Sequence, residues 1–165
     1  MATFYFDTSA IVKRYHKEIG SEILDRIFEL KGHAFAISFW CILEFTVVFS
    51  NKLRKGELSR EAFNAAISLF FRDVLERFIV VSVDDELVAS AVSLAVKHAL
   101  PSADCLQLAS AINLRETLEP LKEPFIFVCS DRDLCKAAEK EGMNFIDPEE
   151  KDALEKLSKF IRLKL

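Results

Sequence analysis

The chain has 165 residues, of which 51% are hydrophobic and 29% are charged, and its formal net charge is −4 at pH 7. This length is enough for a substantial core, so we expect residues 1–165 to form one domain, and the hydrophobic fraction argues against disorder. A small negative charge points to no nucleic-acid partner by itself, so RNA or DNA binding would need a local basic patch.

A short aromatic run at the start of the chain ends in an acid. Residues Thr3–Phe6 favour a buried strand, and Asp7 follows them directly. We expect Thr8 or Ser9 to cap a helix over about 9–16. Asp7 would then stand at the carboxyl end of a strand, at the edge where open α/β sheets bind their ligands.

Three helices and two strands are predicted between residues 21 and 83. One of these helices contains Glu44 among almost entirely apolar neighbours, and buried acids are rare without a functional or ionic reason. The predicted elements are a helix with Ser21 as its N-cap that stops at Gly32, a strand over 33–38, a helix over 39–56, a helix capped by Ser59 and a strand over 78–83.

The second half of the chain repeats the layout of a strand followed by an acid. Phe125–Cys129 is a continuous apolar run, typical of a central parallel strand, and Ser130 and Asp131 follow it. Asp104 is expected in the first helical turn after Pro101. The other predicted elements are a helix from Asp84–Asp85 to about His98, a helix that stops at Gly142, a strand over 144–146 and a helix that runs to the C-terminus.

The alternation of short strands with helices predicts a three-layer α/β/α fold with a central parallel sheet of about five strands. Strand ends and helix starts lie on the same edge of such a sheet, so we expect four acids to gather there: Asp7, Glu44, Asp104 and Asp131. Carboxylates that gather either take up protons or bind a cation, and an oxygen-only ligand set favours Mg²⁺ or Mn²⁺ over Zn²⁺. Such an ion can activate water for attack on a phosphodiester, and no nearby histidine offers a protein base.

Four motifs, in this order, resemble those of PIN-domain proteins, especially the VapC-type toxins of toxin–antitoxin pairs. They are FDTSAIVKRY at 6–15, LEF at 43–45, DCLQLASA at 104–111 and SDRD at 130–133, the last followed by the stretch 142–148. The resemblance covers nearly the whole chain. It implies a PIN-like, Rossmann-like fold and a Mg²⁺- or Mn²⁺-dependent endoribonuclease.

The resemblance also implies roles for single residues and for partners. The catalytic and metal-binding acids would be Asp7, Glu44, Asp104 and Asp131, and Ser130 fills the place of a usual hydroxyl residue. Asp133 is close enough to Asp131 to share or replace its role. The expected partners are an RNA substrate, a cognate antitoxin protein and a second copy of the chain in a homodimer.

Each of these residues also has a structural explanation. Asp7 and Asp131 can cap helices, Asp104 suits the positive end of a helix dipole, and Glu44 can pair with an arginine. The basic residues can either bind RNA phosphates or form a solvated face: Lys13, Arg14, Lys52, Arg54, Lys55 and Arg132.

Three rival functions were weighed. A phosphatase of the haloacid-dehalogenase type needs a second Asp two residues after the first, where this chain has Ser9. A phosphoryl-accepting receiver domain needs paired acids at the first strand, which supplies only Asp7, although Asp84 follows a later strand. The third rival is a PIN-like module that binds RNA or protein without cleaving it.

The sequence has no sign of secretion or membrane insertion. Its start, MATFYFDTS, lacks a signal-peptide pattern, and charges interrupt the apolar segments before a membrane-spanning length. The predicted location is the cytoplasm. The cysteines form neither a CxxC pair nor a metal-type spacing with histidine, so we expect buried, reduced thiols at Cys41, Cys105, Cys129 and Cys135.

Overall fold

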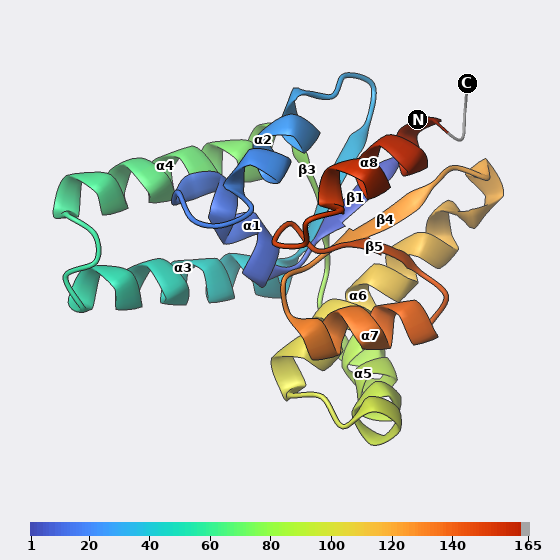
Figure 1. Ribbon diagram of the computed structural model, residues 1–165. Coiled ribbons are helices and arrows are strands. Elements are labelled where there is room, and N and C mark those ends of the chain that lie inside the picture. Colours follow the sequence, from blue (N-terminus) through green and yellow to red (C-terminus); the bar gives the residue numbers. More distant parts are fainter. Residues whose placement is uncertain (163–165) are drawn as a thin grey trace.

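A five-stranded parallel sheet forms the centre of the computed structural model, which describes residues 1–162 (Figure 1). The strand order is β3-β2-β1-β4-β5, and every neighbouring pair is parallel. The first strand is therefore central, because it pairs with both β2 and β4. The strands are β1 (Thr3–Phe6), β2 (Ala34–Ser38), β3 (Phe78–Val81), β4 (Phe125–Val128) and β5 (Asn144–Ile146).

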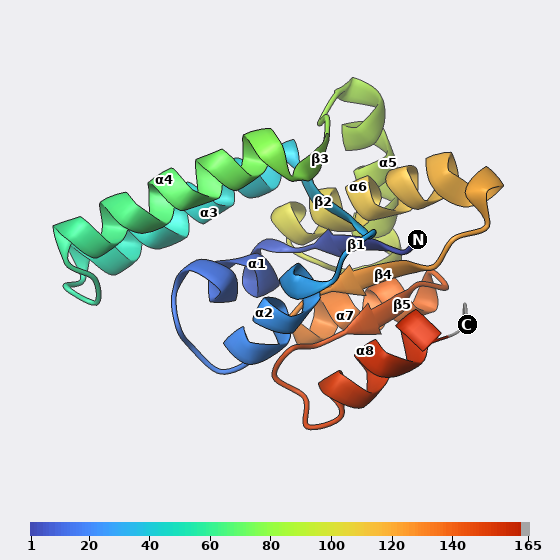
Figure 2. The ribbon, with the colours of Figure 1, turned by 90° about the horizontal axis from the view of Figure 1, so that it is seen from above.

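Helices cover both faces of the sheet, and α3 and α4 extend together as a long antiparallel pair on one side (Figures 1 and 2). The described residues form eight α-helices and one 3-10 turn. They are α1 (Thr8–Tyr15), α2 (Ser21–Glu29), α3 (Phe39–Arg54), α4 (Arg60–Glu76), α5 (Asp85–His98), α6 (Ser102–Leu118), η1 (Glu119–Leu121), α7 (Arg132–Lys140) and α8 (Ala153–Arg162).

The central strand divides its side chains between two cores. Phe4 and Phe6 pack with residues of α1, α2, α3, α4 and α8, whereas Tyr5 packs with α5, α6 and α7. All three aromatic side chains are fully buried, as expected where successive residues of a strand point to opposite, covered faces. The predicted three-layer α/β/α fold is therefore confirmed.

Two helix starts differ from the prediction. Asp7, and not Thr8 or Ser9, caps α1, because its carboxylate accepts the Ser9 N–H. Gly20 precedes α2 with φ of 89°, a conformation that glycine adopts readily, and Ser21 is the first helical residue. The Ser21 hydroxyl is used elsewhere: it donates to the Lys13 carbonyl at 2.7 Å.

Most other boundaries differ from the prediction by one or two residues, and α2 ends at Glu29, three residues before Gly32. The second strand begins at Ala34 and not at residue 33, and the third ends at Val81 and not at residue 83. The end of the last predicted helix, at 163–165, lies outside the described residues. All four cysteines are buried free thiols, as predicted. Over residues 1–162, every helix is too short or too polar to span a membrane.

Candidate functional site

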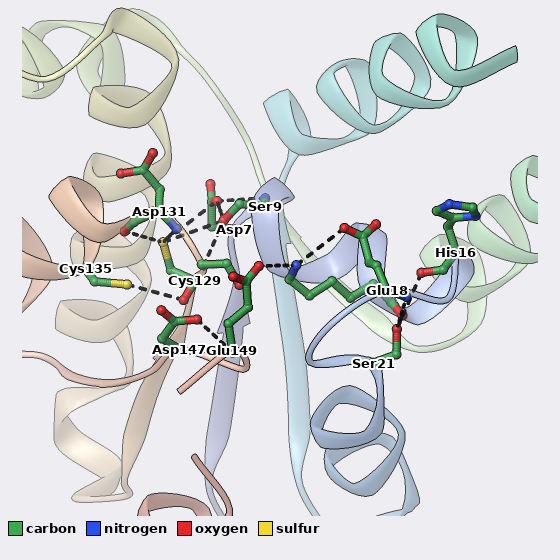
Figure 3. A network of polar contacts seen from close by, with 12 residues as sticks. Asp7, Ser9, His16, Glu18, Ser21, Cys129, Asp131, Cys135, Asp147 and Glu149 are labelled. Atoms are coloured by element: carbon green, nitrogen blue, oxygen red, sulfur yellow. Dashed lines mark hydrogen bonds and ion pairs between the residues drawn. The ribbon is translucent and has the colours of Figure 1, made fainter. Parts of the chain in front are cut away.

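Asp7 lies at the carboxyl end of the central strand, where the chain turns into α1. Its side chain is only 4% exposed, and its Oδ2 atom accepts the Ser9 N–H at 2.8 Å and the Ser9 hydroxyl at 2.5 Å. Ser9 Oγ in turn accepts the N–H of Ser130 at 2.9 Å. Ser9 therefore connects the end of β1 to the loop after β4 (Figure 3).

Asp131 occupies the corresponding place after the neighbouring strand. It caps α7, and its Oδ1 atom accepts the N–H groups of Asp133 and Leu134, each at 2.9 Å. The thiol of Cys129 lies between the two strand-end acids in Figure 3: Sγ is 4.0 Å from Asp7 Oδ2 and accepts the Asp131 N–H at 3.3 Å. The parallel pairing of β1 with β4 thus brings Asp7 and Asp131 to one edge.

Glu44 reaches this edge from α3, which begins directly after β2. Its Oε2 atom accepts two hydrogen bonds of 2.7 Å, one from the Thr8 hydroxyl and one from the side-chain amide of Gln107. Thr8 is the first residue of α1 and Gln107 lies in α6, so the Glu44 carboxylate is held between three helices. The alternative explanation of Glu44, a pairing with arginine, is not what the structure shows.

Asp104 completes the group from the first turn of α6. Burial first, and then the negative charges of Asp7, Asp131, Glu44 and Asp133, together raise its pKa to about 7. The pKa of Asp7 is also raised, to about 6, by burial and by the charge of Glu44, against the lowering effect of its hydrogen bonds from Ser9. These mutual effects require the carboxylates to lie near one another.

Three of the four carboxylates share one arrangement: protein donors hold one oxygen atom, and the other oxygen receives no hydrogen bond from residues 1–162. The held atoms are Oδ2 of Asp7, Oε2 of Glu44 and Oδ1 of Asp131. In the described part of the chain, none of the four acids forms an ion pair with a Lys, Arg or His side chain. The site therefore keeps a concentrated, unneutralised negative charge.

The donor chemistry of this site fits a hard divalent cation, because every candidate ligand is an oxygen atom. Ser130 Oγ adds a buried hydroxyl oxygen that has no hydrogen-bond partner within residues 1–162. In their present side-chain positions, however, no three His, Cys, Asp or Glu residues of the described chain are grouped closely enough to hold a metal ion. Binding would therefore require the carboxylates to move closer together.

The basic residues near the site do not all remain available for a substrate. Lys13 is 4% exposed, and its Nζ atom is 2.6 Å from Glu149 Oε1 and 3.6 Å from Glu18 Oε2. A phosphate-binding role for Lys13 is thus wrong for this structure, whereas Arg132 is exposed and forms no ion pair within residues 1–162.

Two cavities lie at opposite edges of the sheet. The larger, about 570 Å³, is lined by residues that begin strands, including Thr3, Ala34 and Phe125. The smaller, about 360 Å³, is lined by Ser130 and Arg132. None of the four acids lines either cavity. The smaller reaches the carboxyl edge through Ser130, the residue before Asp131, whereas the larger lies at the opposite edge of the sheet.

Gln107 and the hydroxyl roles of Thr8 and Ser9 complete the site. The sequence predicts Thr8 and Ser9 mainly as helix caps, with a hydrogen bond from Ser9 to a site carboxylate as a further role. It gives no prediction for Gln107. Its spacing of three residues from Asp104 in a predicted helix was the available signal, because residues three apart share a helix face.

Comparisons with known proteins agree with this geometry. The family model for the PIN domain matches residues 4–140. No curated protein matches the chain by sequence. Similar solved structures include VapBC2 from Rickettsia felis, bound to a fragment of promoter DNA, at 15% identity and a TM-score of 0.58, covering 87% of this chain and 96% of that one.

Two further solved structures show the same fold. VapBC-1 from nontypeable Haemophilus influenzae is 14% identical, with a TM-score of 0.58, over 91% of this chain and 100% of that one. VapC20 from Mycobacterium tuberculosis, described as a toxin that cleaves the sarcin-ricin loop, is 16% identical, with a TM-score of 0.57, over 81% and 94%. At these identities, the likeness establishes the fold.

Proposed function

Because this chain belongs to the PIN-domain family, we propose that it is a metal-dependent endoribonuclease that hydrolyses phosphodiester bonds of RNA. The observation that carries the proposal is the convergence of four carboxylates, from four different helices and strand ends, without a neutralising lysine or arginine in residues 1–162. Uncompensated buried charge destabilises a fold, so its presence at a sheet edge is typical of a functional site.

The four acids would share the work of holding Mg²⁺ or Mn²⁺: Asp7, Glu44, Asp104 and Asp131. The bound ion would supply Lewis acidity for the attacking water and the departing oxygen. Ser9 keeps one oxygen of Asp7 occupied, and thereby leaves the other for the ion. The hydroxyl of Ser130, which has no hydrogen-bond partner within residues 1–162, would orient water or substrate beside them.

The decisive test measures RNA cleavage by purified wild-type protein and by Asp7→Asn, with EDTA, Mg²⁺ or Mn²⁺. The proposal expects cleavage only with a divalent ion and a loss of at least roughly 100-fold in Asp7→Asn. It also expects Mn²⁺ to raise the melting temperature of the wild type, since a ligand that binds the folded state stabilises it. Equal cleavage by both proteins, or RNA binding without metal-dependent products, would overturn the proposal.

We further propose that the protein is the toxin of a toxin–antitoxin pair, acts in the cytoplasm, binds a cognate antitoxin and forms a homodimer. The support is the likeness to the VapBC complexes, each of which contains a toxin with its antitoxin. Induced expression should arrest growth with the wild type and not with Asp7→Asn. Co-expression of a small protein encoded in an adjacent reading frame should restore growth and co-purify with the chain. Sedimentation of the purified protein tests the homodimer.

A further inference from the structure

The side chain of Gln107 is fully buried and uses its complete hydrogen-bonding capacity inside the protein. Its Oε1 atom accepts the hydroxyls of Tyr5 at 3.1 Å and Ser38 at 2.9 Å. Its Nε2 atom donates to Thr8 Oγ1 at 2.9 Å and to Glu44 Oε2 at 2.7 Å. One carboxamide thus ties α6 to the first two strands and to α1 and α3.

The direction of these hydrogen bonds follows from the partners. A carboxylate only accepts, so the nitrogen of Gln107 must face Glu44. The Ser38 oxygen already accepts the Cys41 N–H at 2.9 Å, which leaves the Ser38 proton for Gln107 Oε1. Each hydrogen bond of the network therefore has a defined donor and acceptor. Two of them, from the Gln107 amide and the Thr8 hydroxyl, are donated to the same Glu44 atom, Oε2.

The arrangement selects one oxygen of Glu44. Oε2 receives both the Gln107 amide and the Thr8 hydroxyl, while Oε1 receives no hydrogen bond from any residue of 1–162. The Thr8 hydroxyl accepts a hydrogen bond from the Gln107 amide and donates one to the Glu44 carboxylate, so the position of the amide also fixes the hydroxyl that holds Glu44. A long, flexible Glu side chain in a helix would otherwise sample several rotamers.

We propose that Gln107, with Thr8 as its relay, is a positioning residue that holds Glu44 so that Oε1 is available to a divalent cation. The inference rests on the proposed function, because it concerns the same metal site. Gln107 itself does not touch the ion or the substrate. It restricts the Glu44 side chain before the ion binds, so that less conformational entropy is lost on binding. Residues that hydrogen-bond to a metal ligand raise metal affinity in this way.

The test titrates Mn²⁺ into metal-free, full-length protein by calorimetry. Gln107→Met keeps the size of the side chain and removes its amide, so we expect the dissociation constant for Mn²⁺ to rise roughly 10- to 100-fold. Leu108→Val is the matched control: this neighbour in α6 is equally buried, but its apolar side chain packs in the core under α5, α6 and α7 and takes no part in the hydrogen bonds to Glu44. It should lower stability with a change in Mn²⁺ affinity of less than about threefold.

A second pair of variants keeps the test decisive if Gln107→Met does not fold. Thr8→Val removes the hydroxyl that reaches Glu44 Oε2 and Thr8→Ser retains it, so we expect weak Mn²⁺ binding in the first and near wild-type binding in the second. Excess Mn²⁺ should also restore the cleavage rate of Gln107→Met, because the defect lies in metal affinity. A merely structural role of the network predicts no such rescue.

The outcomes separate the two proposals. If the wild type binds Mn²⁺ and Gln107→Met, or in its place Thr8→Val, binds it equally well, the positioning role is refuted and the nuclease proposal stands. If the wild type itself does not bind Mn²⁺, the proposed metal site fails, and the role of Gln107 fails with it.

Discussion

The hydroxyl of Ser9 donates to Asp7 Oδ2 at 2.5 Å and accepts the N–H of Ser130 at 2.9 Å. A single side chain therefore joins the carboxyl ends of two neighbouring parallel strands and holds the most buried acid of the site. We expect Ser9→Ala to lower metal-dependent RNA cleavage by roughly 10- to 100-fold, as the loss of a residue behind a metal ligand does.

Ser9→Ala should also lose stability. Its hydrogen bond to the Asp7 carboxylate and the one it accepts from the Ser130 N–H are both lost, and the bond to the charged group alone costs about 1.5 to 3 kcal/mol in the free energy of unfolding. Ser90→Ala is a suitable control, because the Ser90 hydroxyl donates to a carbonyl of its own exposed helix, away from the four acids. Cleavage assays and chemical denaturation measure both effects. Wild-type cleavage by Ser9→Ala would contradict its role.

The raised pKa of Asp7 makes stability depend on pH. Folding moves this pKa from 3.8 to about 6, mainly through burial, so the folded protein binds a proton that the unfolded chain has released. The free energy of unfolding in EDTA should therefore fall as pH rises from about 4 to 6, by up to about 3 kcal/mol from Asp7 alone. Asp104, whose pKa is raised to about 7, acts in the same direction.

The Asp7→Asn variant has no titrating group at position 7, so it should lack the part of the pH dependence of stability that comes from Asp7. Asparagine can still cap α1, so the main change is the loss of a buried charge. At pH 7.5 the variant should be more stable than the wild type, and the difference should disappear near pH 4. Thermal unfolding across this pH range provides the measurement. A variant less stable than the wild type at pH 7.5 would show that burial of the Asp7 charge does not strain the fold.

Asp131 and Asp133 can now be distinguished. Both side chains are exposed and both charges raise the pKa of Asp104, but only Asp131 caps α7, where one of its oxygens accepts two N–H groups and the other receives no hydrogen bond within residues 1–162. Asp133 is exposed, and it lies 3.6 Å from Lys136 Nζ. We expect Asp131→Asn to lower cleavage by at least roughly 100-fold and Asp133→Asn by less than about threefold. Equal losses in the two variants would show that both acids serve the site.

The backbone of the site was predictable because it follows from a local pattern. A strand followed directly by an acid occurs at Asp7 and again near Asp131, and parallel pairing brings such ends together whatever the intervening sequence. Glu44 was predictable as a site residue because its neighbours in the sequence are almost entirely apolar. Asp104 was recognisable from its position in a first helical turn.

The side-chain partners were not predictable from the sequence. Gln107 contacts Thr8 and Glu44, which are 99 and 63 residues away, and no local pattern encodes such a contact. The burial of Lys13 likewise depends on Glu149, a residue 136 positions away in a loop. Sequence periodicity reports which face of an element is apolar, whereas these contacts depend on how distant elements pack.

Lys13 and Arg132 should therefore behave differently in RNA binding. Lys13 is held between Glu149 and Glu18, so Lys13→Met should lower the free energy of unfolding by about 2 kcal/mol. Its loss should leave the salt dependence of RNA binding unchanged. Arg132 is exposed, follows Asp131 in the chain and lines a cavity together with Ser130. Arg132→Gln should weaken RNA binding and lower the slope of log K against log salt by roughly 0.7, the value for one phosphate contact on a single strand.

Titrations of a labelled, non-cleavable RNA at several salt concentrations, in parallel with denaturation curves, separate the two effects. Arg26→Gln is the control, because it makes the same change in charge as Arg132→Gln at a different place. Arg26 lies in the last turn of α2 and not at the edge that carries the acids. It should leave both the affinity and the salt slope within error of the wild type. A reduced slope for Lys13→Met, or an unchanged slope for Arg132→Gln, would mean that the RNA approaches the acids from the side of α1 and not over the start of α7.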